Sequence, residues 1–318
     1  TPEESITKTM TIVKKITSSD TSAAKDAINI KDQQFNQTIA YTEPSTNPGN
    51  IPAILFAGKA GTIDSNGQAY DRTVDGTGIE ARFQLPLGMV ADKAGNLYVA
   101  DFGAHNIRKI SPKAVVTNFA GPASADCEIQ RLCPSGYADG TGNAARFTYP
   151  RGLAMDSIGN LYVGNFSNIR KISPTGVVST LAGPDSSICT PTTICPRGYI
   201  NATGTAARFS GIMSMATDAN NNVYVVDSGN NAVRKITPTG VVSTLFKTER
   251  LSGAIALDAQ GNIYVGNGAS GGGILKLTTA GVSSVFVGNN VRVFANDIAI
   301  DATGTLFASD FIGAKINK

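Results

Sequence analysis

The stretch that decides the fold is GNLYVAD at 95–101, which returns as GNLYVGN at 159–165, NNVYVVD at 221–227, GNIYVGN at 261–267 and GTLFASD at 304–310. Successive copies lie between 40 and 64 residues apart. Each copy contains aromatic and β-branched residues, which favour strands. A β-rich unit that repeats with this period is typical of a propeller or a related array rather than a mixed α/β enzyme.

Each copy lies in the same local sequence. An apolar run that ends in Asp precedes it, and a Gly or Asn follows that Asp, so we expect a hairpin turn whose amides the Asp side chain caps. After the copy come a polar loop, a third run such as NIRKI at 106–110, a Pro/Gly turn, and a fourth run such as VVTNFAG at 115–121. Four antiparallel strands in each unit make one blade of a β-propeller.

The combined pattern of these runs resembles the NHL repeat over roughly residues 51–318. The stretch DGTGIEARF at 75–83, with Pro and Gly after it, belongs to the same resemblance and recurs as DGTGNAARFTYPRG at 139–152. The third copy, at 201–214, departs from the pattern, and the last two units lack this stretch. The resemblance implies a β-propeller of a family used mainly as binding modules in multidomain and cell-surface proteins, with a minority of enzymes.

We therefore expect an all-β chain whose residues 51–318 form a five-bladed propeller. The fifth unit stops at Lys318 before its fourth strand, whereas IPAILFAG at 51–58 looks like a fourth strand with nothing before it. A strand at 51–57 that pairs with the last blade would close the ring and remove an exposed sheet edge. Six blades remain the alternative, if residues 1–50 hide a divergent unit or the native chain continues past Lys318.

Residues 1–50 have a different composition, and we expect a short helical segment and a linker there. Thr1, Pro2 and the glutamates after them form a helix-start signal, and apolar residues follow at helical spacing up to Ile16. A second helix is expected over about 23–37, and EPSTNPGN at 43–50 is typical of a linker. The segment either packs on the propeller or connects to another subunit. Neither expected helix is long enough to span a membrane.

The four cysteines form two pairs at the same place in consecutive repeats, CEIQRLC at 127–133 and CTPTTIC at 189–195. This placement favours two local disulfides, Cys127–Cys133 and Cys189–Cys195, over a zinc site without a nearby histidine. Disulfides persist in oxidising compartments, so we expect a secreted, periplasmic or cell-surface protein. Lys and Arg total 27 against 24 acidic residues, without a basic run, which argues against a nucleic-acid partner.

Few residues are candidates for catalysis or metal binding. His105 is the only histidine, so a multi-histidine zinc centre cannot form. We expect it to be structural or exposed, and it is also a candidate binding residue of the loops. Oxygen ligands for calcium could instead come from the residues that end the repeated YV strands. These are Asp101, Asn165, Asp227, Asn267 and Asp310. Their presence in every blade is also what a turn-capping role predicts, which we prefer, so no cofactor is required and calcium belongs to the alternative.

Topology places the recognition loops on one face. In an antiparallel blade, the connection to the next blade emerges on the same face as the loop between strands two and three. The three long insertions (59–85, 122–149 and 184–211) are connections of this kind, and long loops on a rigid scaffold commonly carry recognition. Without Trp, tyrosines such as Tyr137 and Tyr199 are the candidates for stacking on a sugar. Arg82, Arg146 and Arg208 recur beside a Phe, where they either tie down loop carbonyls or contact a ligand.

Two functions fit these features. The first is a non-catalytic extracellular module that binds a protein or glycan, or builds a surface assembly through the loops of one face and residues 1–50. The alternative is a calcium-dependent propeller hydrolase, lactonase or lyase that acts at the central channel. The glutamates all lie outside the YV strands, which favours the binding module.

Overall fold

The computed structural model describes residues 7–15, 34–42, 56–58, 73–127, 133–189, 195–268, 272–288, 293–301, 303–310 and 315–318. The chain divides into two compact units, Thr1–Ile54 and Leu55–Lys318. The helices among the described residues are 3-10 turns of three residues each. No helix in this part of the chain has the length and apolar character needed to cross a membrane.

The first unit contains a β-hairpin where the sequence predicted helices. Strands β1 (Thr7–Lys15) and β2 (Gln34–Thr42) pair antiparallel, with Thr7 opposite Thr42. The helix predicted up to Ile16 is therefore wrong over β1, and the second predicted helix is wrong over its last residues, 34–37. Thr, Ile and Val dominate the middle of β1, and β-branched side chains lose rotamer freedom in a helix but fit a strand. Residues 16–33 lie outside the described part.

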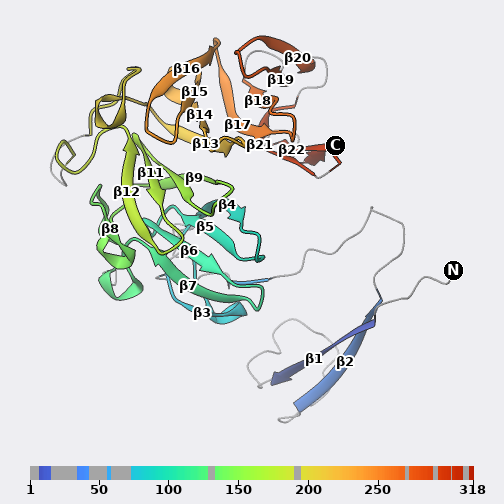
Figure 1. The fold of residues 1–318 in the computed structure, drawn as a ribbon. Helices are drawn as coiled ribbons and strands as arrows, with labels where there is room; N and C mark the ends of the chain where they lie inside the picture. The colour runs from blue at the N-terminus through green and yellow to red at the C-terminus, as the bar shows by residue number, and fades with distance from the viewer. Residues whose placement is uncertain are drawn as a thin grey trace, which may run out of the picture. The chain divides into compact units, whose positions relative to one another are not determined.

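The second unit is a five-bladed β-propeller, as the sequence predicted (Figure 1). The first blade consists of β4 (Pro86–Ala91), β5 (Leu97–Asp101), β6 (Asn106–Ile110) and β7 (Val115–Ala120). The second consists of β9 (Pro150–Met155), β10 (Leu161–Asn165), β11 (Asn168–Ile172) and β12 (Val177–Ala182). Neighbouring strands within each blade pair antiparallel.

The other three blades follow the same order. The third contains β13 (Ile212–Thr217), β14 (Val223–Asp227), β15 (Ala232–Ile236) and β16 (Val242–Lys247). The fourth contains β17 (Leu251–Leu257), β18 (Ile263–Asn267), β19 (Ile274–Leu277) and β20 (Ser283–Val287). The fifth contains β21 (Ala295–Ile300), β22 (Leu306–Asp310) and β23 (Lys315–Asn317). The described part of the fifth blade therefore has three strands.

The long connections into the first two blades add a fifth strand to their outer edges. Strand β3 (Gly76–Thr77) pairs with β7, and β8 (Gly140–Thr141) pairs with β12. In the third blade a single bridge, Thr203 to Val241, takes this place. These contacts cover sheet edges that would otherwise present unpaired amides and carbonyls.

The repeated Asp holds the hairpin before each YV strand, as the sequence predicted. In the second blade, Asp156 accepts hydrogen bonds from the amides of Ile158 and Asn160, from the Asn160 side chain, and from the Tyr162 hydroxyl at 3.0 Å. Gly159 takes a φ of 89° in this turn. Tyr162 is fully buried, so its hydroxyl needs this partner. One motif thus forms the turn and satisfies a polar group in the core.

Alternate side chains of each YV strand fill the spaces between blades. Tyr98 of the first blade packs in one cluster with Leu161 and Val163 of the second, whereas Val99 packs on the other side of its sheet. Tyr162 packs in the same way against Val223 and other residues of the third blade. Because both faces of β5, β10 and β14 are buried, these strands are apolar up to the Asp or Asn that ends each of them.

The predicted closing strand at 51–57 lies almost entirely outside the described residues and stays a prediction. Described residues do show how the chain enters the first blade. The Gly58 amide donates to the Gly78 carbonyl at 2.9 Å. Where the chain enters the second and third blades, the Gly121 amide donates to the Gly142 carbonyl and the Gly183 amide to the Gly204 carbonyl. The first blade is therefore entered in the same way as the second and third.

Candidate functional site

The loops between the second and third strands of the first three blades lie against the connections that enter the blades. The amides of Phe102 and Gly103 donate to the carbonyls of Leu85 and Gln84, and the Ser228 amide donates to Gly211. We call this surface the loop face, made of residues 101–106, 165–168 and 227–231 with the connections that enter the first three blades. The backbone contacts place these elements on one side of the propeller.

Three buried arginines fasten the connections to the blades. Arg108, Arg170 and Arg234 are fully buried and come from the third strands of their blades. Each donates to two carbonyls of the connection, for example Arg170 to Arg146 and to Ala138, both at 2.8 Å. The guanidinium also lies over the Phe of the ARF motif, 5.1–5.3 Å from the ring centroid. In the sequence, these arginines are visible only as an Arg that recurs in the third strand of the first three blades. The signal for their role was that this Arg repeats with the same period as the ARF motif.

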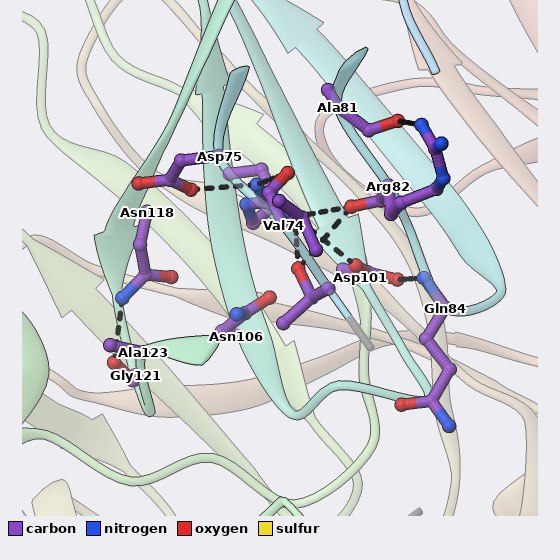
Figure 2. Close-up of polar contacts among 12 residues, drawn as sticks. Val74, Asp75, Ala81, Arg82, Gln84, Asp101, Asn106, Asn118, Gly121 and Ala123 are labelled. Atoms are coloured by element: carbon purple, nitrogen blue, oxygen red, sulfur yellow. Dashed lines mark hydrogen bonds and ion pairs between the residues drawn. The ribbon is translucent and has the colours of Figure 1, made fainter. Parts of the chain in front are cut away.

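The predicted binding residues Arg82, Arg146 and Arg208 lie in the connections themselves. Each uses Nη1 to donate to the carbonyls one and three residues earlier, as Arg208 does to Ala207 and Thr205 at 2.7 Å. The sequence offered two roles for these arginines, holding loop carbonyls or contacting a ligand. These hydrogen bonds correspond to the first role. The contact of Arg82 with the Ala81 carbonyl is drawn in Figure 2.

The candidate calcium ligands cap the ends of the connections, just before the first strand of each blade. Asp101 Oδ1 accepts from the Gln84 amide at 2.7 Å (Figure 2), and Asp227 Oδ1 accepts from the Ser210 amide at 2.7 Å. Asn165 and Asp310 likewise accept from the amides of Thr148 and Phe294, while Asn267 ends β18 in the fourth blade. Among the described residues, no three His, Cys, Asp or Glu side chains form a group that could hold a metal ion.

The three arginines have different acidic partners. Arg170 pairs with Asp139 at 2.6 Å, and the strand-end residue of that blade is the neutral Asn165. Arg234 pairs with the strand-end Asp227 at 2.8 Å, and the connection supplies the neutral Asn201. Arg108 alone has both carboxylates, Asp75 at 2.7 Å and Asp101 at 3.7 Å. Burial raises the pKa of the Asp101 carboxyl to about 6, against the attraction of Arg108.

An aromatic cluster lies on the loop face at the junction of the first two blades. Tyr149 is its centre: its ring lies 4.9 Å from Phe102, 4.7 Å from His105 and 6.4 Å from Phe166 between centroids. Arg197 lies 4.5 Å above the Phe166 ring. We call Phe102, His105, Tyr149, Phe166 and Arg197 the aromatic cluster. A Phe directly follows the YV strand in three repeats, at 102, 166 and 311, and this sequence signal did not enter our prediction.

His105 holds Tyr149 in place. Its Nδ1 accepts a hydrogen bond from the Tyr149 amide at 3.1 Å, which requires the neutral imidazole. Burial lowers the pKa of His105 to about 4, so the neutral form is the one present at physiological pH. The predicted binding residue His105 thus positions an aromatic side chain of the next blade.

Three members of the cluster have a left-handed backbone. The φ angles are 55° at His105, 51° at Tyr149 and 53° at Phe166. The residue that corresponds to Tyr149 in the third blade is Gly211, at a φ of 75°. For a bulky residue this conformation costs about 1–2 kcal/mol, and the corresponding residue of the first blade, Leu85, also has it, at a φ of 62°. The second blade nevertheless carries a tyrosine there, with 44% of its surface exposed.

The remaining predicted residues, Tyr137 and Tyr199, lie in the connections that enter the second and third blades. Tyr137 is buried against the second disulfide, whereas Tyr199 is 41% exposed and is flanked by Arg234 and Lys247. Both disulfides are present, Cys127–Cys133 and Cys189–Cys195. The first packs against Ala104 of the loop face. The disulfides therefore anchor the long connections on this face and fit an oxidising compartment.

Five sheets around a common channel, with three connections fastened by buried arginines, define the protein as a five-bladed β-propeller. A family model described as NHL repeat matches residues 83–110. Over 96 residues, 30% of this chain, the sequence is 35% identical to Protein SUPPRESSOR OF QUENCHING 1, chloroplastic, of Arabidopsis thaliana. It is 39% identical over 98 residues to NHL repeat-containing protein 2 of Bos taurus. These matches support the predicted resemblance of the chain to the NHL-repeat β-propellers.

These similarities cover only part of each protein. The matches span 8% of the Arabidopsis protein and 12% of the bovine one. Among solved structures, virginiamycin B lyase of Staphylococcus aureus is similar, with 16% identity and a TM-score of 0.46 over 73% of this chain and 79% of that one.

Proposed function

We propose that this propeller is an extracellular binding module that recognises a protein or glycan partner through its loop face. The aromatic cluster is the observation that carries the proposal. Tyr, Phe and Arg are enriched where proteins make their strongest contacts, and here they form one group on rigidly held loops. His105 and the strained backbone keep Tyr149 partly exposed, although Gly211 shows that the fold accepts a residue without a side chain at this position.

The electrostatics of the loop face fit a binding role better than catalysis. Arg108, Arg170 and Arg234 all donate to the connections, and the imidazole of His105 is occupied by the Tyr149 amide. The strand-end side chains Asp101 and Asp227 are occupied by loop amides. These groups serve to hold the loops, which leaves the aromatic cluster as the surface offered to a partner.

The proposal is tested with the full chain on an array of immobilised glycans and a panel of purified extracellular proteins. The informative variant is Tyr149→Gly, because it removes the ring and also relieves the left-handed strain, so the propeller is expected to stay folded. Ile158→Ala is the matched control: Ile158 is 69% exposed in the turn between β9 and β10, on the side opposite the loop face.

We expect at least one glycan or protein to bind the native chain and the Ile158→Ala variant equally, and to lose roughly tenfold or more in affinity with Tyr149→Gly. Equal binding by all three proteins would show that the cluster is not the recognition surface. Turnover of a lactone or ester that depends on added calcium would instead favour the catalytic alternative.

Self-assembly through residues 1–50 is the second part of the proposal. Strands β1 and β2 pair as a two-stranded hairpin in the N-terminal unit, and a two-stranded hairpin on its own is marginally stable in water. We expect the full chain to have a larger native mass than a chain that begins at residue 51, with or without a calcium chelator. Monomers in both cases would contradict this part of the proposal.

A further inference from the structure

The innermost strands of the five blades line a central channel with a cavity of about 130 Å³. Its wall combines the apolar side chains of Leu87, Met89 and Met213 with the polar side chains of Arg151, Ser214 and Asp297. Apolar walls with a few convergent polar groups are the usual composition of a small-ligand site.

Glycines in the innermost strands bring these walls close together. A Cβ on Gly88 of the first blade would lie 1.9 Å from the carbonyl oxygen of Arg151, and one on Gly152 would lie 3.0 Å from the carbonyl oxygen of Met213. Neither contact is compatible with a side chain unless the backbone moves. The position of Gly88 and Gly152 is occupied by Ser214 in the third blade and by Asp297 in the fifth. Both residues line the cavity, so polar groups are present where the strand backbones lie close together.

Arg151 is unlike the other arginines of the propeller interior. Arg108, Arg170 and Arg234 each have a carboxylate within 2.6–2.8 Å, whereas no described side chain forms an ion pair or hydrogen bond with the Arg151 guanidinium. Burial lowers the pKa of Arg151, with no acidic neighbour acting against it. Placing an unpaired cation in a partly buried site costs free energy that an anionic ligand would recover.

The repeat itself shows that the fold does not need this cation. The position of Arg151 is occupied by Leu87 in the first blade and by Met213 in the third. An arginine in one blade only is therefore a feature of the channel in this chain and not of the blade architecture.

Asp297 supplies a second polar group, from the fifth blade. The fifth blade is not a neighbour of the second blade in the ring, so Asp297 and Arg151 come from separate parts of the channel wall. Its Oδ1 accepts from the Ile298 amide at 3.0 Å, and its side chain still reaches water in the channel. A carboxylate in this setting is an acceptor for an ammonium or hydroxyl group.

We propose that the channel binds a small organic carboxylate that also carries a hydrogen-bond donor, with the ligand carboxylate on Arg151 and the donor on Asp297. Arg151 provides charge-assisted hydrogen bonds, which a guanidinium makes to a carboxylate in bidentate form. Leu87, Met89 and Met213 provide the apolar contact for the carbon chain between the two ends. This site is independent of the aromatic cluster and of any macromolecular partner on the loop face.

The probes are γ-aminobutyrate, pentanoate and pentylamine, which have similar lengths and carry both polar ends, the carboxylate alone, or the amine alone. Calorimetric titration of the full chain is expected to rank γ-aminobutyrate above pentanoate, with pentylamine weakest. Arg151→Leu places in the second blade the residue that the first blade already has, so it should fold, and circular dichroism checks this. Arg250→Gln removes an exposed arginine that lies outside both the channel and the aromatic cluster, and it is the control.

We expect Arg151→Leu to weaken γ-aminobutyrate binding roughly tenfold or more, since it removes a charge-assisted pair, while Arg250→Gln leaves it unchanged. Asp297→Asn should reduce the preference for γ-aminobutyrate over pentanoate. The proposal is overturned if none of the carboxylates binds at millimolar concentration, or if Arg151→Leu binds them as well as the native chain does. Equal affinity for γ-aminobutyrate and pentanoate would overturn the role of Asp297.

Discussion

Replacing Asp101 by Asn in the first blade should stabilise the protein at neutral pH. Asp101 Oδ2 and Asn106 Oδ1 are buried without a hydrogen-bond partner (both residues are labelled in Figure 2). In the second blade, the corresponding Asn165 donates from Nδ2 to Asn168 Oδ1 at 2.8 Å. The Asn106 amide nitrogen is held by the Pro122 carbonyl, so its oxygen is already oriented to accept. Asn at position 101 would supply the missing hydrogen bond.

The magnitude follows from the ionisation of Asp101. Burial raises its pKa from 3.8 to about 6, a shift of about two units, and each unit corresponds to about 1.4 kcal/mol. Keeping the carboxylate ionised at neutral pH therefore costs up to about 3 kcal/mol, and a new buried hydrogen bond contributes about 1 kcal/mol. Loss of the 3.7 Å contact with Arg108 acts in the opposite direction, but Arg108 keeps Asp75. We expect a net gain of about 2 kcal/mol.

The sign of the pH dependence is opposite for Asp101 and His105. The folded-state pKa of Asp101 lies above its unfolded value, so its protonation stabilises the protein fully below pH 3.8, and this stability is lost as the pH rises through about 6. The pKa of His105 is lowered from 6.5 to about 4, so its contribution is lost as the pH falls through that range. The advantage of Asp101→Asn should therefore be largest near neutral pH and small near pH 4.

Denaturant titrations of the native chain and the variant, followed by circular dichroism near pH 4 and near pH 7.5, measure this difference. Because both proteins contain His105, its contribution cancels in the comparison. A variant that is less stable near pH 7.5 would refute the reasoning, since it would show that the ion pair with Arg108 outweighs the cost of the buried carboxylate.

Three further substitutions test the rest of the architecture. Asp227→Asn should destabilise by about 3 kcal/mol in the same titrations, because it leaves buried Arg234 without a carboxylate; a gain in stability would contradict the pairing. Gly88→Ala should lower the melting temperature far more than Gly288→Ala, whose Cβ would meet its nearest neighbour at 3.9 Å, and equal effects would argue against the tight channel wall. Replacing both Cys127 and its partner by Ser should cost on the order of 2 kcal/mol and speed amide exchange in the first disulfide loop, and unchanged exchange would show that the bridge does not anchor it.

The repeats made the propeller predictable, because each blade carries its own turn and strand signals. The Asp that ends the first run, the Gly or Asn of the turn and the buried Tyr are close in sequence, so a local pattern contains the whole hairpin. The N-terminal unit was predicted wrongly because a helix-start signal and a few apolar residues at helical spacing outweighed the β-branched residues of β1. Two local preferences competed there, and the strand preference prevailed.

The site was only partly predictable, since its contacts join residues from different blades. Repetition identified Arg82, Arg146 and Arg208 as loop residues, but it could not show that Arg108 and its equivalents are the groups that reach across to the connections. The aromatic cluster joins a loop of the first blade to a connection of the second, 44 residues later, through His105 and Tyr149. The channel pair, Arg151 and Asp297, departs from the repeat, so a search for repeated residues passes over it.

Hydrogen–deuterium exchange of the full chain, alone and with the glycan or protein that the binding screen identifies, tests the central claim most directly. If the loop face is the recognition surface, the ligand should slow exchange at 101–106, 148–149 and 165–168, with no change in the turn at 156–160 on the opposite side. Protection confined to the turns of the opposite side, with the loop face unchanged, would contradict the assignment of this surface.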